Sequence, residues 1–214
     1  MEIFLDSVDL NEIEELKEFI DGITTNPSLI AKSGCKDKYE DLISEICSII
    51  TGPVSVEVVA DNHEDMIRKG LKLAKIASNI MVKLPLTHEG LISCKKLWTE
   101  HKIPANVTLC FSPGQALLAA KASACFISPF VGRLDDTSYG GLSLIKDIYT
   151  IYSNYGFDTK ILVASVRSPV HVIEAARLGA NSITVPARVL RQLFNHPLTD
   201  QGLAIFEKDW GTKQ

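Results

Sequence analysis

The sequence lacks the short patterns that usually mark a metal centre or a nucleotide site. Its five cysteines are widely spaced and form no CxxC pair, and its five histidines show neither HxH nor HExxH spacing. These spacings argue against a disulfide framework and a zinc site. The glycine-rich pattern GxGxxG is absent, which argues against a dinucleotide-binding loop. GxSxG is absent as well, so no hydrolase nucleophile elbow is indicated. We expect no bound metal.

Long apolar runs and an excess of positive charge are also missing. No apolar segment approaches the roughly 18 residues of a membrane span. The 22 basic residues stand against 26 acidic ones, for a net charge of −4, whereas nucleic-acid binders usually carry a basic excess. The opening residues MEIFLDSVDL have no basic stretch and do not resemble a signal peptide. The sequence predicts a cytoplasmic protein with no nucleic-acid partner and no membrane partner.

Eight short apolar or β-branched runs alternate with segments of helical periodicity. Strands that alternate with helices indicate βαβ units and a parallel sheet, and eight such units close a (β/α)8 barrel. An open doubly wound sheet is the alternative, but the first run ends in LDSVDL, without the glycine-rich loop of such folds. The predicted strands are 3–7, 22–26, 54–59, 80–85, 105–110, 125–130, 160–166 and 182–186.

We therefore predict an α/β protein with a single (β/α)8 TIM barrel domain over residues 1–214 and an extra C-terminal helix at about 198–210. In that helix Leu203, Phe206 and Trp210 fall on one face. This face should pack on the barrel or on a neighbouring subunit.

Polar side chains recur at the ends of the predicted strands, which is where the active sites of such barrels lie. Because residues i and i+2 of a strand face the same side, the spacing assigns several of these side chains to the mouth of the barrel. The candidate site residues are Asp6, Thr24, Asn26, Glu57, Lys83, Asn106, Thr108, Ser128, Phe130, Arg133, Ser165 and Arg167.

Lys83 and Glu57 stand out because each interrupts an apolar run. Lysine and glutamate are rarely buried unless they are paired or functional, and a structural salt bridge is the plain alternative. A buried lysine that gives up its proton can attack a carbonyl carbon and form a Schiff base. That reaction needs a carboxyl group nearby to move protons, and Asp6 and Glu57 are the candidates.

Two arginines and a serine lie at or just beyond the ends of the sixth and seventh predicted strands. Arg133, Ser165 and Arg167 suit a phosphate group, because guanidinium groups bind phosphate in a forked geometry. Taken singly, each arginine is more often a surface charge. Their common position at one rim favours an anion site.

Five segments closely resemble the transaldolase family, and most of all its short-chain branch, which also contains fructose-6-phosphate aldolase. They are GITTNPSLI (22–30), MVKLPLT (81–87), NVTLCFSPGQA (106–116), FISPFVGRLDD (126–136) and ASVRSP (164–169). The resemblance runs from Met1 to about Trp210. It implies a class I aldolase barrel that needs no metal and no organic cofactor.

The resemblance also implies individual roles. Lys83 corresponds to the Schiff-base lysine, Asp6 to the acid/base aspartate, and Glu57, with Thr108, to the groups that position a proton-carrying water. In the aldolases, the position of Glu57 is typically glutamine and that of Phe130 is typically tyrosine, so this sequence has the transaldolase pattern. The implied substrate-binding residues are Thr24, Asn26, Asn106, Ser128, Phe130, Arg133, Ser165 and Arg167.

The implied activity is transfer of a dihydroxyacetone unit from a ketose phosphate, sedoheptulose 7-phosphate or fructose 6-phosphate, to an aldose phosphate in the pentose phosphate pathway. The alternative is fructose-6-phosphate aldolase, which would release free dihydroxyacetone. A more remote alternative is a non-catalytic barrel that binds sugar phosphates. The resemblance further implies a homo-oligomer, either a pentamer or a decamer.

Overall fold

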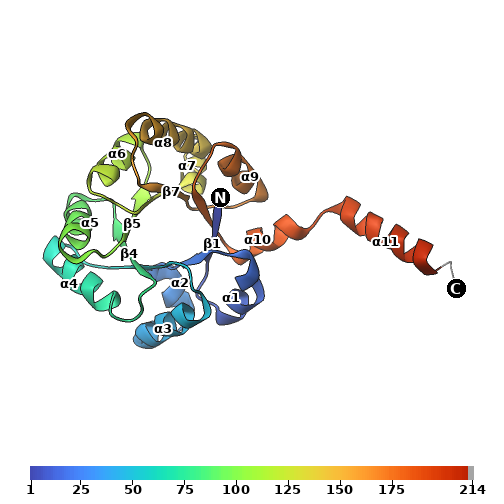
Figure 1. Cartoon of the computed structure of the whole chain (residues 1–214), viewed down its shortest axis with the longest axis horizontal. Helices are drawn as coiled ribbons and strands as arrows, with labels where there is room; N and C mark the ends of the chain where they lie inside the picture. The colour runs from blue at the N-terminus through green and yellow to red at the C-terminus, as the bar shows by residue number, and fades with distance from the viewer. Residues whose placement is uncertain (212–214) are drawn as a thin grey trace.

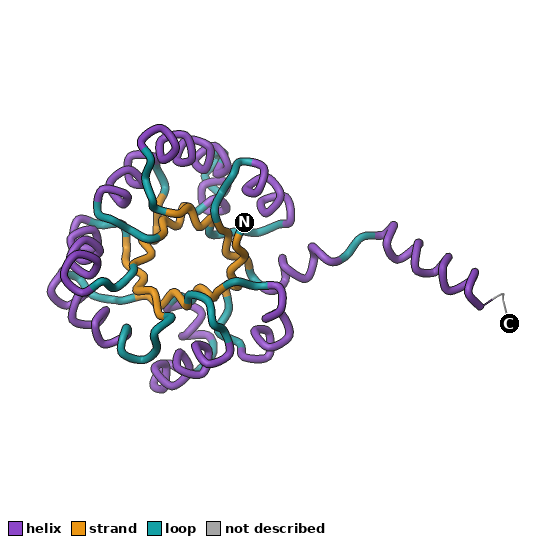
Figure 2. The backbone as a smooth tube through the Cα atoms, in the orientation of Figure 1, coloured by secondary structure: helices purple, strands orange, loops and turns teal. Residues whose placement is uncertain are grey.

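The computed structural model describes residues 1–211, and eight parallel strands in it close into a barrel in sequence order, with β8 pairing back to β1. Figures 1 and 2 show this ring of strands with the helices around it. The predicted (β/α)8 barrel is confirmed. The strands are β1 (Glu2–Asp6), β2 (Gly22–Thr24), β3 (Val54–Glu57), β4 (Ile80–Pro85), β5 (Ala105–Cys110), β6 (Phe126–Pro129), β7 (Lys160–Val163) and β8 (Ser182–Val185).

Helices follow the strands, and all but the last of them lie around the outside of the barrel. They are α1 (Leu10–Leu16), α2 (Pro27–Lys32), α3 (Tyr39–Ile49), α4 (His63–Leu73), α5 (His88–His101), α6 (Pro113–Lys121), α7 (Val131–Asp135), α8 (Gly141–Tyr155), α9 (Pro169–Arg177), α10 (Ala187–Phe194) and α11 (Pro197–Gly211). Local sequence sets several of their starts. Asn62 accepts a hydrogen bond from the Asp65 N–H at the start of α4, and Ser112 accepts one from the Gln115 N–H at the start of α6.

A small apolar cluster fills the lower part of the barrel interior. It consists of Phe4, Met81, Phe126 and Leu162, which come from four different strands. The rings of Phe4 and Phe126 meet edge to face with centroids 5.7 Å apart. Gly22 pairs with Phe4 across β1 and β2, and a Cβ atom there would lie 2.6 Å from the Phe4 ring, so only glycine fits. We call these four side chains the floor cluster.

The floor cluster positions the polar residues of the mouth. Asp6, Lys83 and Ser128 each follow a floor residue by two positions along the same strand, so they point into the barrel one layer higher. The floor cluster is therefore an apolar layer directly beneath the polar layer at the carboxyl ends of the strands.

Helix α11 leaves the barrel and extends away from it (Figure 1). It spans almost the predicted range, but none of its residues is buried, and Trp210 is 84% exposed. We expected its apolar face to pack either on the barrel of the same chain or on a neighbouring subunit. In the structure this face does not pack on the barrel. No helix within residues 1–211 combines the length and the apolar character needed to cross a membrane.

We predict that Phe126→Ala lowers the free energy of unfolding by about 3 to 5 kcal/mol, the usual cost of removing a buried phenylalanine ring. Phe126 is 3% exposed and leaves a cavity under the mouth when truncated. Denaturant unfolding measures the change. Tyr139→Ala is the control, because Tyr139 is 73% exposed, and its effect should stay within about 0.5 kcal/mol. Equal effects of the two variants would contradict a packed floor.

Candidate active site

A cavity of about 520 Å³ opens at the carboxyl ends of the strands. It is lined by all the predicted site residues except Arg167, and each strand contributes to it directly or through the residues that follow it. The predicted residues that line it are Asp6, Thr24, Asn26, Glu57, Lys83, Asn106, Thr108, Ser128, Phe130, Arg133 and Ser165.

A largely buried ion pair lies among the residues that line the cavity. Lys83 Nζ lies 3.2 Å from Glu57 Oε2, and the two side chains are only 8% and 16% exposed. Lys83 Nζ also donates a hydrogen bond to the Thr25 carbonyl oxygen at 3.0 Å. The two residues are direct neighbours in the β3–β4 register. A carboxylate in contact with a buried amine can take up its proton, which is what a nucleophilic lysine requires.

Asp6 is a second carboxyl group in the same cavity. Burial raises the pKa of Asp6 above the ordinary aspartate value, although the nearby Lys83 charge and hydrogen bonds from Thr24 and Asn26 act in the opposite direction. Thr24 Oγ1 donates to Asp6 Oδ1 at 3.0 Å and lies 2.6 Å from Thr184 Oγ1. Because a hydroxyl has one proton, Thr184 must donate to Thr24. A carboxyl with a raised pKa suits a group that gains and returns a proton.

A row of buried hydrogen bonds holds Asn106. Its amide nitrogen donates to Ser55 Oγ at 3.0 Å, and its amide oxygen accepts from Ser128 Oγ at 2.8 Å. All three side chains are buried. The amide is therefore held in one orientation from β3 on one side and β6 on the other, and it is available to contact a ligand from above.

Thr108 has an unused hydroxyl. Its Oγ1 is buried and hydrogen-bonds no other group within residues 1–211. A buried polar atom without a protein partner usually meets water or a ligand. The next residue, Leu109, has φ of 63°, at a register shift between β5 and β6. Ser165 also has a positive φ, of 59°. Such strained backbone in non-glycine residues concentrates at functional sites.

Aromatic contacts place Arg133 at the rim. The guanidinium carbon lies 4.9 Å from the centroid of the Phe130 ring, and Phe130 meets Phe111 edge to face at 5.6 Å. Within the described residues Arg133 forms no ion pair, so its charge is available to an anion in the cavity. Phe130 therefore acts as a platform for this arginine.

Arg167 is the predicted site residue that the structure does not bring into the cavity lining. Its guanidinium makes two hydrogen bonds to the carboxylate of Asp136, one of them 2.6 Å long from Nη2 to Oδ2. Both side chains are about half exposed. Its role in phosphate binding stays a prediction.

Several lining residues were not singled out from the sequence. Thr184 was missed although it lies on β8 with the same period-two spacing as the others, and that spacing could have identified it. Lys32, at the end of α2, gave no pattern that separates it from a surface lysine. The further lining residues are Pro27, Ser28, Leu29, Lys32, Leu109, Ala164 and Thr184.

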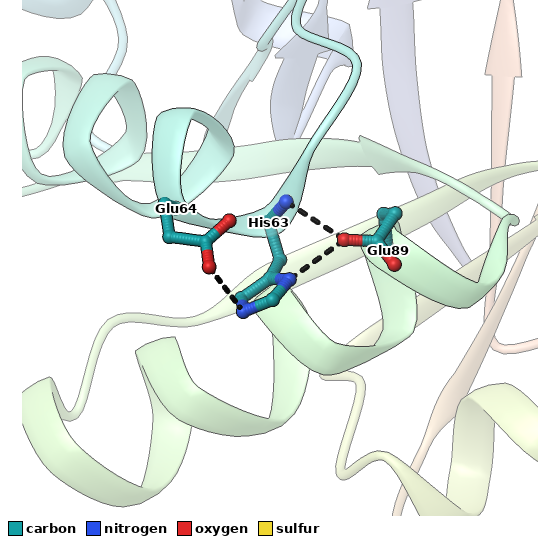
Figure 3. A group of neighbouring side chains, drawn as sticks. All are labelled: His63, Glu64 and Glu89. Atoms are coloured by element: carbon teal, nitrogen blue, oxygen red, sulfur yellow. Dashed lines mark hydrogen bonds and ion pairs between the residues drawn. The ribbon is translucent and has the colours of Figure 1, made fainter.

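A histidine and two glutamates form a separate cluster where α4 and α5 begin (Figure 3). His63 Nδ1 lies 2.6 Å from Glu89 Oε2, and Nε2 lies 3.1 Å from Glu64 Oε1. Hydrogen bonds from His63 and His88 lower the pKa of Glu89 to about 2. The two carboxylates contact different nitrogens of the His63 ring. A metal ion bound at one ring nitrogen would therefore have only one of the two carboxylates beside it, while the other stayed at the second nitrogen. These contacts tie α4 to α5. The absence of a metal role for the histidines stays a prediction.

Known proteins resemble this chain over nearly its whole length. The model of the family described as Transaldolase/Fructose-6-phosphate aldolase matches residues 3–213. A protein of Caulobacter vibrioides named probable transaldolase is 55% identical over 214 residues, 99% of this chain and 97% of that protein. A protein of Thermodesulfovibrio yellowstonii with the same name is 52% identical over 212 residues, 98% of each chain.

Among solved structures, 3-hexulose-6-phosphate synthase aligns with a TM-score of 0.68 at 14% identity, over 90% of this chain and 98% of that one. At this identity the likeness shows the barrel fold alone. The family model spans nearly the whole chain, and the two bacterial relatives are more than half identical to it. The chain therefore belongs to the transaldolase/fructose-6-phosphate aldolase family.

Proposed function

We propose that this protein is a transaldolase that moves a dihydroxyacetone unit from a ketose phosphate to an aldose phosphate through a Schiff base on Lys83. The observation that carries the proposal is the buried Lys83–Glu57 pair, with Asp6 in the same cavity. A pure binding site for sugar phosphates needs no buried amine. The reaction would belong to the pentose phosphate pathway in the cytoplasm.

The first step is attack on the ketose. Glu57 takes a proton from Lys83, and the neutral amine adds to the C2 carbonyl of fructose 6-phosphate or sedoheptulose 7-phosphate. Loss of water from the carbinolamine leaves an iminium ion. Thr108, whose buried hydroxyl has no protein partner, would hold with Glu57 the water that carries protons in this step.

The second step breaks a carbon–carbon bond. Asp6 removes the proton of the C4 hydroxyl, the C3–C4 bond cleaves, and its electron pair moves into the iminium to give an enamine. The lysine thus supplies the electron sink, and no organic cofactor is needed. Asn26 and Asn106 would hold the hydroxyl groups of the three-carbon unit, with Ser128 keeping the Asn106 amide in place.

The third step is transfer. The first aldose phosphate leaves and a second one, erythrose 4-phosphate or glyceraldehyde 3-phosphate, enters with its phosphate near Arg133, Ser165 and Arg167. The enamine attacks its aldehyde carbon, Asp6 returns the proton, and hydrolysis frees the new ketose and Lys83. Phe130 supports Arg133 in this arrangement.

A product assay tests the transfer. With fructose 6-phosphate and erythrose 4-phosphate together, the protein should form sedoheptulose 7-phosphate and glyceraldehyde 3-phosphate, and with fructose 6-phosphate alone it should release little free dihydroxyacetone. Chromatography with mass detection measures all five compounds. Lys83→Met is the negative control, and Lys121→Met the matched lysine variant outside the cavity. Steady release of dihydroxyacetone without an acceptor would instead assign the aldolase reaction.

The exposed face of α11 supports a second part of the proposal, a homo-oligomer. Leu203, Phe206 and Trp210 are all more than half exposed on a helix that stands away from the barrel. Exposed apolar patches of this kind mark interaction sites. We infer that α11 packs on a second copy of this chain, in a pentamer or a decamer as the family resemblance implies.

We predict that a variant with Phe206→Asp and Trp210→Asp has a lower mass in solution than the unmodified protein, because the charges disrupt the apolar face. Analytical ultracentrifugation measures the mass. Tyr139→Asp, which places a charge on an exposed aromatic of the barrel, should leave the mass unchanged. An unmodified protein that sediments as a monomer would contradict the assignment.

A further inference from the structure

The main chain of Arg167 is held by hydrogen bonds on both its N–H and its carbonyl group, whereas its side chain has a single hydrogen-bonding partner. The Arg167 N–H donates to His171 Nδ1 at 3.3 Å, and the Arg167 carbonyl accepts a hydrogen bond from Arg188 at 3.3 Å. Its guanidinium has the Asp136 carboxylate as its hydrogen-bond partner, in a forked pair. The backbone position of Arg167 is therefore set independently of what its guanidinium binds.

Asp136 binds the Arg167 guanidinium and is also influenced by the charge of Arg133. It follows Arg133 by three residues at the end of α7, so the two side chains leave the same side of the helix. The hydrogen bonds from Arg167 lower the pKa of Asp136, and the charge of Arg133 adds to this effect. Arg133 lines the cavity, whereas Arg167 does not. The carboxylate thus links Arg167, which lies outside the lining, to the end of the helix that carries the cavity-lining Arg133.

Gly132 brings Arg167 close to this rim. A Cβ atom on Gly132 would lie 2.2 Å from the Ser165 carbonyl oxygen and 2.9 Å from Arg167 Nε. The Arg167 side chain therefore passes directly against Gly132 in the first turn of α7. The next residue, Arg133, and Ser165 both line the cavity.

The neighbouring aspartate makes different contacts. Asp135 Oδ1 accepts a hydrogen bond from the Gly141 N–H at 2.8 Å, and Asp135 Oδ2 lies 3.1 Å from His171 Nε2. Asp135 thus joins α7 to α8 and α9, which is a structural task. The hydrogen bonds of the Asp136 side chain within residues 1–211 are those from Arg167. The pair is about half exposed, and such pairs stabilise a fold by about 1 kcal/mol or less.

We propose that Asp136 is a built-in competitor for the phosphate group of the substrate, and that Arg167 exchanges the Asp136 carboxylate for that phosphate when a sugar phosphate enters. A carboxylate and a phosphate offer the same two-oxygen edge to a guanidinium group. Asp136 then sets how tightly the cavity holds phosphate monoesters, and so the balance between substrate capture and product release. This inference rests on the phosphate site of the proposed function.

The test uses inorganic phosphate as the probe and four forms of the full chain: unmodified, Asp136→Asn, Arg167→Gln and the double variant. Isothermal titration calorimetry at constant ionic strength gives the phosphate Kd. Asp136→Asn should tighten phosphate binding about threefold to fivefold, the value of an exposed ion pair. Its KM for fructose 6-phosphate should fall by a similar factor, with a smaller change in kcat. In the Arg167→Gln background the same substitution should bring no gain.

Asp135→Asn is the matched control, because it removes an equal charge one residue away. An equal gain in this variant would show a general charge effect and overturn the exchange. Weaker phosphate binding by Asp136→Asn would also overturn it, because Asp136 would then orient Arg167 for the phosphate. Phosphate binding by Asp136→Asn that equals that of the unmodified protein would overturn the exchange as well. If Arg167→Gln leaves the phosphate Kd unchanged, the phosphate role of Arg167 is wrong, while the product assay still decides the transfer reaction separately.

Discussion

The ion pair between Lys83 and Glu57 lies inside the barrel above the apolar floor cluster, and the other polar residues of the mouth surround it. Removing two charges from water is costly, and a buried pair is a weak source of stability. Other groups surround the pair. The Thr25 carbonyl oxygen accepts a hydrogen bond from Lys83, and Asp6, whose pKa is raised by burial, lies in the same cavity. An amine and two carboxyls in one small cavity are explained by proton transfer better than by folding.

Much of the arrangement of the mouth follows from the alternation of side chains along each strand, in which every second residue faces the same side. Phe4 and Asp6, Met81 and Lys83, and Phe126 and Ser128 are pairs in which an apolar residue is followed two positions later by a polar one. A closed barrel turns each pair into a floor residue and a mouth residue, because alternate side chains of a strand face inward. Eight strand-like runs, each separated by a helical segment, were enough to predict that barrel, so the sequence was sufficient to place most of the site.

The other residues of the site depend on tertiary contacts that no local sequence pattern predicts. In the sequence Thr184 resembles an ordinary strand residue, and only the structure shows the hydrogen bond between its hydroxyl and that of Thr24. Lys32 is the last residue of the short helix α2, and its place at the cavity depends on the direction in which α2 leaves β2. Arg167 was predicted at the rim from its neighbours, yet its guanidinium binds Asp136, which lies 31 residues earlier in the chain. Side-chain partners of this kind depend on tertiary geometry rather than on spacing.

The central claim is that Lys83 is the amine that bonds covalently to the substrate. Borohydride reduction of the protein with fructose 6-phosphate, followed by digestion and mass spectrometry, tests it most directly. The account predicts a dihydroxyacetone-derived mass on the peptide that contains Lys83, and none on that peptide in the Lys83→Met variant. A label on another lysine, or no label in a protein whose circular dichroism shows it folded, would contradict the account.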